Sequence, residues 1–309
     1  MKGIRIGVGV TDAGNTPLDD LVGQVKAAED AGFHSVWIPN IFGMDAMTVC
    51  AMAGRETSRI ELATAVIPTY SRHPMYCAQQ AATTQAACDG RFVLGLGPSH
   101  KVVIEALLGL SYAKPARHVR EYLTIVTQLL EKGETQFEGE TYSVKGRLAV
   151  ACGKPPQVMI GALGPLMRKI AGSLCDGTIT WMTGPVTLES EVGPGVRTAA
   201  EAAGRPAPRI VAGVPVALTD DPDGAREFAA QAFAMYGTLP SYRAMMDVEG
   251  VDGPAGLTLA GDEKVIEAGI RRYADAGVTD FNAAIFPHGD DRKAALARTH
   301  AFIGELARQ

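Results

Sequence analysis

The sequence predicts an α/β protein folded as a (β/α)8 TIM barrel with insertion segments. Short apolar runs alternate with longer amphipathic stretches along the whole chain, which is the pattern of repeated strand and helix units. Eight such units can be counted. The chain has 309 residues, 47% of them hydrophobic, so one barrel domain over 1–309 accounts for its length. A doubly wound open sheet is the alternative, because such a count can miss one unit.

The expected strands are short apolar runs that recur at barrel spacing. They are 4–10, 35–38, 60–67, 91–96, 157–161, 178–181, 210–218 and 280–285. The first expected helix begins at Pro17, since proline is tolerated in a first turn, and it stops at Gly32. The expected helices are 17–31, 45–56, 74–88, 101–108, 115–132, 165–174, 188–203, 224–235, 262–276 and 292–307.

Two segments do not follow the alternation. The stretch 133–156 is polar and Gly-rich, and it predicts a short hairpin inserted before the fifth strand. The stretch 236–260 crowds aromatic and Met side chains into what we expect to be a loop-rich lid. Both insertions belong to the same predicted domain.

Composition excludes several classes of protein. The formal charge of −5, from 29 Lys and Arg against 34 Asp and Glu, includes no basic run, so nucleic acid is not an expected partner. No apolar stretch approaches the roughly 20 residues of a membrane helix, and the first residues read as a strand rather than a signal peptide. The five cysteines form no CxxC pair and are expected to be reduced thiols. We therefore expect a soluble cytoplasmic protein that acts on a small molecule.

The carboxyl ends of barrel strands converge on one mouth, where chemistry is expected. The residues expected there are Thr11, Asp12, Pro39, Asn40, Thr69, Tyr70, Arg72, His73, Ser99, His100, 161–164, 181–183 and His288. They include no clustered metal ligands, no strand lysine for a Schiff base and no GxSxG elbow. A mouth with few strong acids or bases suits a cofactor that brings its own chemistry.

Two glycine-containing segments are candidates for cofactor contacts. Gly95 and Gly97 resemble a dinucleotide fingerprint, but position 100 is His, so tight turns explain them equally well. GALGP at 161–165 ends a strand and leads directly into a helix, whose first-turn amides can bind a phosphate, with Arg168 adding charge. Glycines that only make the turn are the alternative.

The chain resembles the luciferase-like superfamily, and within it the deazaflavin branch that uses coenzyme F420. The resemblance covers nearly the whole chain. It rests on AGFHSVW at 31–37, ATAV at 63–66, YSRHP at 70–74, GRFVLGLGPSH at 90–100, GALGP at 161–165 and CDGT at 175–178. Each motif is modest alone, but their order and spacing are specific.

The resemblance implies a cofactor site. It places a non-prolyl cis peptide at Ala65–Val66, behind the deazaflavin ring, and places Asn40 facing that ring. The same resemblance puts Gly97 and Ser99 at the edge of the ring. It implies that Gly161, Leu163, Gly164 and Arg168 hold the phosphate of the tail, and that the protein is a homodimer.

Departures from the sugar-phosphate dehydrogenases of this branch bear on the substrate. Those enzymes have an Asp-His pair after strand two where this chain has Asn40 and Ile41, and an acid after strand four where it has His100. We therefore expect a bulkier, more apolar substrate. The residues expected to contact it are Ile41, Tyr70, Trp181, Met182 and Tyr236, with Phe42 and Met44 nearby.

The expected reaction is hydride transfer between the deazaflavin and an organic substrate, more plausibly as a reductase. His100 is the leading proton donor, because an imidazole titrates near neutral pH. Contact with the cofactor tail and capping of a turn are its alternatives. The alternative activities are an FMN-dependent monooxygenase of the same superfamily and a non-catalytic flavin-binding or partner subunit.

Overall fold

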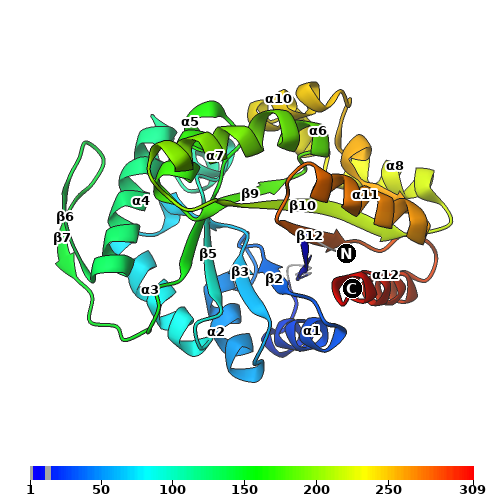
Figure 1. Ribbon diagram of the computed structural model, residues 1–309, viewed down its shortest axis with the longest axis horizontal. Helices are drawn as coiled ribbons and strands as arrows, with labels where there is room; N and C mark the ends of the chain where they lie inside the picture. Colours follow the sequence, from blue (N-terminus) through cyan, green and yellow to red (C-terminus); the bar gives the residue numbers. More distant parts are fainter. Residues whose placement is uncertain (1–2, 11–14) are drawn as a thin grey trace.

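The protein is a closed barrel of eight parallel strands ringed by helices (Figure 1). The computed structural model describes residues 3–10 and 15–309. Each barrel strand pairs with the next, and β10 pairs with both β9 and β12 and so closes the ring. The open-sheet alternative is therefore wrong. The barrel strands are β1 Arg5–Gly9, β2 Ser35–Ile38, β3 Glu61–Thr64, β5 Phe92–Gly97, β8 Gln157–Gly161, β9 Gly177–Trp181, β10 Arg209–Leu218 and β12 Asp280–Ile285.

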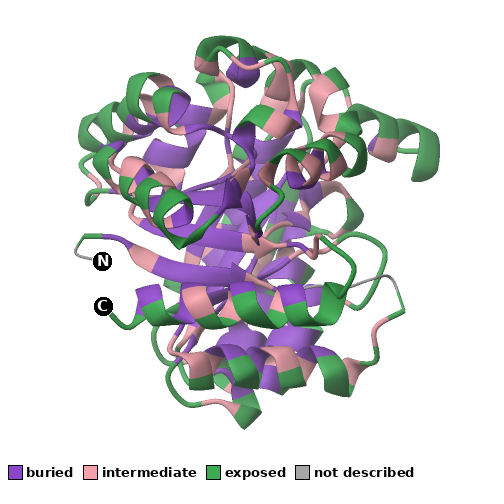
Figure 2. Cartoon of the chain, turned by 90° about the vertical axis from the view of Figure 1, so that its right-hand side faces the viewer, coloured by how far each residue is buried: buried purple, intermediate pink, exposed green. Residues whose placement is uncertain are grey.

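The helices pack their apolar faces on the strands and turn their polar faces outward (Figure 2). The main ones are α1 Leu18–Ala31, α2 Ala46–Glu56, α3 Pro74–Ala87, α4 Pro115–Lys132, α5 Pro165–Leu174, α7 Gly193–Ala202, α8 Pro222–Ala232, α11 Glu263–Asp275 and α12 Arg292–Ala307. Shorter turns are η1 Thr69–Ser71, η2 Val103–Leu107, α6 Pro185–Thr187, η3 Leu188–Val192 and η4 Pro254–Leu257. Helix α1 ends at Gly32, whose φ of 88° needs the freedom of glycine.

Several expected elements have different bounds. The expected strand 60–67 is divided into β3 and β4 (Ile67–Pro68), because the chain bends at a cis peptide between Ala65 and Val66. The expected helix 188–203 is a π-helical turn, η3, followed by α7. The expected helix 224–235 is observed as α8, which ends at Ala232, and a new helix begins after Phe233.

The first insertion is the predicted hairpin. Strands β6 (Glu134–Glu138) and β7 (Ser143–Arg147) pair antiparallel and stand at the side of the barrel beside α4 (Figure 1). The carboxylate of Glu121 on α4 accepts the backbone N–H groups of Glu140, Thr141 and Tyr142. These bonds fix the turn of the hairpin to the helix and lower the pKa of Glu121 against the effect of its burial.

The second insertion is helical, so the expectation that it is loop-rich is wrong, while its role as a lid stays a prediction. It contains α9 (Ala234–Thr238), α10 (Pro240–Glu249), η4 and the short strand β11 (Leu259–Gly261), which extends the sheet beside β10. Pro240 suits the first turn of α10, and Gly250 ends it in the left-handed region. Glu249 then accepts hydrogen bonds from the backbone of Val186 and Thr187, which holds α10 over α6.

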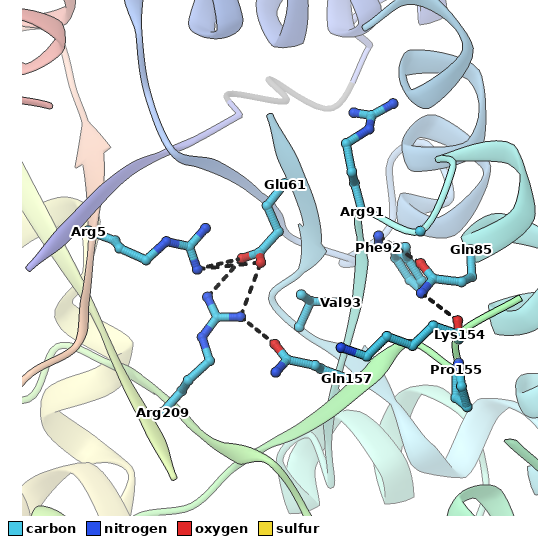
Figure 3. A pocket seen from close by; sticks show the side chains of 11 residues that line it. Arg5, Glu61, Gln85, Arg91, Phe92, Val93, Lys154, Pro155, Gln157 and Arg209 are labelled. Atoms are coloured by element: carbon cyan, nitrogen blue, oxygen red, sulfur yellow. Dashed lines mark hydrogen bonds and ion pairs between the residues drawn. The ribbon is translucent and has the colours of Figure 1, made fainter. Parts of the chain in front are cut away.

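The amino end of the barrel is closed by a cluster of charges, which Figure 3 shows from close by. Arg209 on β10 lies 2.8 Å from Glu61 and 2.6 Å from Asp280, and it also donates to Gln157. Arg5 adds a second contact to Asp280 at 3.1 Å. A cavity opens outward beside this cluster, at the end of the barrel opposite the strands' carboxyl ends.

These ion pairs are structural. Burial would lower the pKa of Arg209, but its hydrogen bonds to Asp280 and Glu61 outweigh that effect and raise it. Asp280 is 1% exposed, so it depends on these cations in place of water. The cluster therefore acts as the floor of the barrel.

We predict that Arg209→Met lowers the free energy of unfolding by about 3 to 5 kcal/mol, because it leaves Asp280 buried with only a partial partner. Urea denaturation at pH 7.5 measures the effect. The matched control is Arg5→Met, which removes a more exposed partner of the same carboxylates and should cost about 1 kcal/mol or less. Equal losses in the two variants would contradict the assignment of Arg209 as the principal partner.

Candidate active site

The carboxyl end of the barrel interior is lined by very small residues. In the middle of the barrel, Trp37, Ala63, Val93, Met159, Ile179 and Val211 pack together. Side chains alternate along a strand, so the inward positions two residues further on form the next layer. Small residues occupy most of these positions, namely Gly9, Ala65, Gly95, Gly161, Gly213 and Ala284, with Gly97 one inward position further along β5 and Trp181 as the large exception. We call it the small-residue layer.

The small-residue layer places few side chains at the carboxyl end of the barrel interior. A Cβ built on Gly9 would meet nothing nearer than 3.7 Å, and one on Gly161 nothing nearer than 3.8 Å, so a methyl group would fit at either position in ordinary van der Waals contact. The inward space at Gly97 is already filled, because a Cβ there would lie 2.5 Å from the Val66 side chain. Trp181 covers Gly213 in the same way, at 3.0 Å. The small inward residues and the Trp181 ring together form a cradle at this end of the barrel.

The backbone around the layer matches what the resemblance implied. The peptide between Ala65 and Val66 is cis, as expected. Ser99, two residues after β5, has a φ of 60°, and its carbonyl accepts the Tyr112 hydroxyl at 3.0 Å. Asn40 follows β2, and its Oδ1 accepts the N–H of Ala46 at the start of α2. The contacts of these residues with a cofactor stay predictions.

His100 lies against the helical insertion. Its ring meets Tyr236 and Tyr242 edge to face, with centroids 6.3 and 5.9 Å apart. The imidazole forms no hydrogen bond with any described residue, and burial lowers its pKa. The segment after β5 and helices α9 and α10 therefore meet at the imidazole of His100.

Trp181 and Tyr236 extend this aromatic cluster. Trp181, at the end of β9, packs edge to face on Phe233 and Tyr236, with centroids 5.6 and 6.1 Å apart. Met182 has no exposed surface and packs with Met246 and Leu257 beneath the insertion. Met182 thus supports the cluster from below in this structure. Tyr242 was expected only as part of the lid, and no strand-end pattern singled it out.

Tyr70 belongs to a second aromatic group. Its ring is stacked between His118, at 3.7 Å, and Tyr112, at 5.3 Å, and its buried hydroxyl has no partner among the described residues. His118 contacts the Thr69 hydroxyl at 3.0 Å. The loops after β4 and β5 are therefore held together by stacking, and Tyr70 forms part of the wall between them.

The phosphate-loop candidates lie together at the end of β8. Gly164 is the residue before α5, and no side chain caps that helix, so its first-turn amides are available to a ligand. Leu163 packs on the barrel core. Arg168 is 7% exposed and forms a 2.7 Å ion pair with Glu191 on η3, so its charge is already partly neutralised.

The remaining mouth candidates are peripheral. Ile41 and Phe42 are 71% and 70% exposed, so they line the outside of the mouth rather than its floor. Arg72 forms an ion pair with Asp45, which braces the loop after β4 as a structural residue would. His288 pairs with Asp221 away from His100. Thr11 and Asp12 lie outside the described residues.

Other kinds of site have no support in the described part of the chain. No group of three or more His, Cys, Asp or Glu residues there could hold a metal ion. The five cysteines are free, and four of them are buried. No helix among residues 3–10 and 15–309 is long and apolar enough to cross a membrane.

One inward polar residue escaped the sequence reasoning. Asn282, in the middle of β12, is 7% exposed, and its Oδ1 has no hydrogen-bond partner among the described residues. Its signal was the alternation Asp280, Asn282, Ala284 against Phe281, Ala283 and Ile285. This alternation puts a polar side chain inside the barrel.

A barrel with this cradle beside an aromatic and histidine cluster is a cofactor-binding enzyme scaffold. The chain belongs to the luciferase-like monooxygenase family, whose model matches residues 4–280. It is 33% identical over 189 residues to a putative coenzyme F420-dependent oxidoreductase of Mycobacterium tuberculosis, covering 57% of this chain and 54% of that protein.

Other relatives extend the similarity. A 5,10-methylenetetrahydromethanopterin reductase of Archaeoglobus fulgidus is 31% identical over 229 residues, covering 70% of this chain and 66% of the relative. The matched segments thus span about half to two thirds of these curated relatives. The solved coenzyme F420-dependent tetrahydromethanopterin reductase of Methanopyrus kandleri has the same fold, with a TM-score of 0.80 and 24% identity over 98% of this chain and 97% of that one.

The stacked histidine predicts a pH dependence of stability. Burial lowers the pKa of His118 to about 4, against an unfolded value of about 6.5. Between these values the unfolded chain binds the proton and the native protein does not, so stability is lost as the pH falls below about 6.5. The contribution of His118 should be about 2 kcal/mol between pH 6.5 and pH 5.

We expect His118→Gln to reduce the loss of unfolding free energy between pH 7.5 and pH 5.0 by about that amount. Urea denaturation of both proteins at the two pH values measures it. The value at pH 7.5 serves as the baseline for any direct cost of the substitution. A pH dependence identical to that of the unsubstituted protein would rule out this role of His118.

Proposed function

We propose that this protein is an F420-dependent oxidoreductase that transfers a hydride between the deazaflavin and a fairly apolar organic substrate. The observation that carries the proposal is the small-residue layer at the carboxyl end of the barrel, the end at which His100 contacts Tyr236 and Tyr242. The F420-dependent relatives support the same cofactor. We further propose that it works as a reductase with the reduced coenzyme, and that it forms a homodimer in the cytoplasm.

The residues present fit a deazaflavin. Gly9 and Gly161 leave space for the ring, while Val66 and Ala65 back it from the cis peptide. Asn40, Gly97 and Ser99 would line its edges. The amides after Gly161, Leu163 and Gly164 would receive the tail phosphate, with Arg168 adding charge if it exchanges from Glu191.

When bound, the deazaflavin supplies a hydride donor or acceptor at carbon five of its ring. The wall of Trp181, Tyr236 and Tyr242 would orient the substrate and exclude water from it. His100, whose ring contacts Tyr236 and Tyr242, would donate from its imidazole the proton that the reduced substrate needs. Ile41 and Tyr70 would extend the substrate surface outward, with Met182 as support.

We predict that His100→Gln lowers kcat for substrate reduction by about 100-fold, because a positioned general acid contributes at least that much. Burial lowers the pKa of His100, so its acid form grows as the pH falls below 6.5. The kcat of the unsubstituted enzyme should therefore rise toward acid pH, and the variant should lose this rise.

The assay follows the oxidation of reduced F420 in the presence of unsaturated and carbonyl compounds at pH 5.5 to 8.5. The matched control is His73→Gln, which replaces an exposed histidine of a neighbouring loop. An unchanged kcat and pH profile in His100→Gln would leave His100 as a contact or capping residue only. Activity only with reduced FMN and oxygen would favour a monooxygenase, and no activity with either would favour a binding subunit.

A further inference from the structure

Among the buried polar atoms of the described residues that have no hydrogen-bond partner, Oδ1 of Asn282 is the one that lies on a strand inside the barrel and can only accept a hydrogen bond. Asn282 lies on β12 level with Gly7 of β1 and Gly213 of β10. Its side chain is 7% exposed, and no described residue donates a hydrogen bond to Oδ1. Buried carbonyl groups without a donor are uncommon in folded proteins, because desolvation is then uncompensated. Such a group calls for a specific explanation.

The amide of Asn282 faces the small-residue layer. Its Oδ1 lies 3.7 Å from the point where a Cβ on Gly9 would stand, and Gly9 is one layer closer to the mouth. Its Nδ2 lies 3.6 Å from the corresponding point on Gly213. The point at Gly9 is in ordinary contact distance of its neighbours, while the point at Gly213 lies 3.0 Å from the Trp181 ring. The amide therefore borders the inward positions of the small-residue layer and the ring of Trp181.

The donors below and beside Asn282 are engaged, with one exception. The Trp37 indole N–H donates to Ser35 Oγ at 2.9 Å. The guanidinium groups of Arg5 and Arg209, one layer below, bind Asp280 and Glu61. The exception is the Trp181 indole N–H, which is buried and, like Oδ1 of Asn282, has no partner among the described residues. Because these two atoms are not bonded to each other, both are left to a ligand that arrives from the mouth.

We propose that Asn282 recognises the imide edge of the cofactor ring, a specificity role that rests on the proposed function and deepens it. A flavin or deazaflavin ring carries an N–H between two carbonyl groups on its pyrimidinedione edge. A primary amide complements this edge, because Oδ1 accepts the N–H while Nδ2 donates to an adjacent carbonyl oxygen. The ring then enters with its polar edge toward β12 and its other edge toward the aromatic cluster.

This assignment makes Asn282 a binding residue rather than a structural one. The unpartnered Oδ1 contributes no hydrogen bond to the free protein, so replacing the amide should not lower the stability of the free protein. The same replacement should weaken binding of the ring, since the loss of two hydrogen bonds leaves the imide without partners in a desolvated site. Stability and affinity therefore respond differently to one substitution.

The test is a two-by-two comparison of protein and ligand. The proteins are the unsubstituted chain and Asn282→Ala, which leaves space for an added methyl group. The ligands are the deazaflavin analogue of riboflavin and the same compound methylated at the imide nitrogen, titrated by fluorescence. A third protein, Thr180→Val, is the matched control, because Thr180 is buried on β9, two strands from β12, and its hydroxyl already donates to Val211 O.

We expect Asn282→Ala to weaken the affinity for the unmethylated ring by about 10- to 100-fold, which is the ordinary effect of losing a pair of hydrogen bonds. The unsubstituted protein should discriminate against the methylated ring by a similar factor, and Asn282→Ala should not discriminate. Thr180→Val should retain both affinities. The melting temperature of free Asn282→Leu, which fills the space, should be equal to or above that of the unsubstituted protein.

An unchanged affinity in Asn282→Ala, or continued discrimination against the methylated ring, would overturn the inference while leaving the proposed function intact. A melting temperature several degrees lower in free Asn282→Leu, with unchanged affinity, would assign Asn282 a structural role instead. Failure of the unsubstituted protein to bind deazaflavin would count against the proposed function. FMN carries the same imide edge, so the same variants titrated with FMN would then decide the inference separately, and failure with both rings would overturn both.

Discussion

The closed ring of parallel strands is the constraint on which the rest of the structure depends. Closure fixes which residue of each strand faces inward, and it stacks these residues in layers along the barrel axis. Here the lowest layer is ionic, with Arg209 between Glu61 and Asp280, and the middle layer is apolar around Trp37. The uppermost layer has small residues on most strands, with Trp181 as the exception. The barrel interior is thus closed by ion pairs at its amino end and lined mainly by small residues at its carboxyl end.

This layering explains why the site lies where it does. The lower cavity borders saturated ion pairs and lies away from the loops that carry His100 and the helical insertion. The upper end offers space, unused amides at α5 and a titratable imidazole beside aromatic rings. A cofactor that brings its own chemistry requires little more from a protein than these features.

The helical insertion completes the mouth. Helices α9 and α10 bring Tyr236 and Tyr242 to within ring contact of His100, and Glu249 fixes α10 to the turn after β9. Met182 and Met246 pack beneath them without exposed surface. The insertion is therefore joined to the barrel through its own small core, so the wall of the site is built before any ligand binds.

The barrel could be predicted from the sequence because the alternation of apolar runs and amphipathic stretches is local and repeated. The hairpin after α4 was also predictable from its polar, Gly-rich composition. The helical nature of 236–260 was missed, because its Tyr and Met residues bury against partners that are distant in the sequence, such as Met182. The cis peptide came from resemblance to the family, not from any local pattern.

The candidate site was only partly predictable. His100, Trp181 and Tyr236 were expected at one mouth, and the structure brings them together. The ion pair of Arg168 with Glu191 was invisible, since nothing local links two residues on separate elements. Asn282 was overlooked because its polarity matters only once strand alternation turns it inward.

The central claim is that the small-residue layer holds a deazaflavin in preference to a flavin. The most direct test is parallel fluorescence titration of the purified protein with oxidised coenzyme F420 and with FMN. The account predicts micromolar or tighter binding of F420 and at least tenfold weaker binding of FMN. Tighter binding of FMN, or binding of neither, would contradict it.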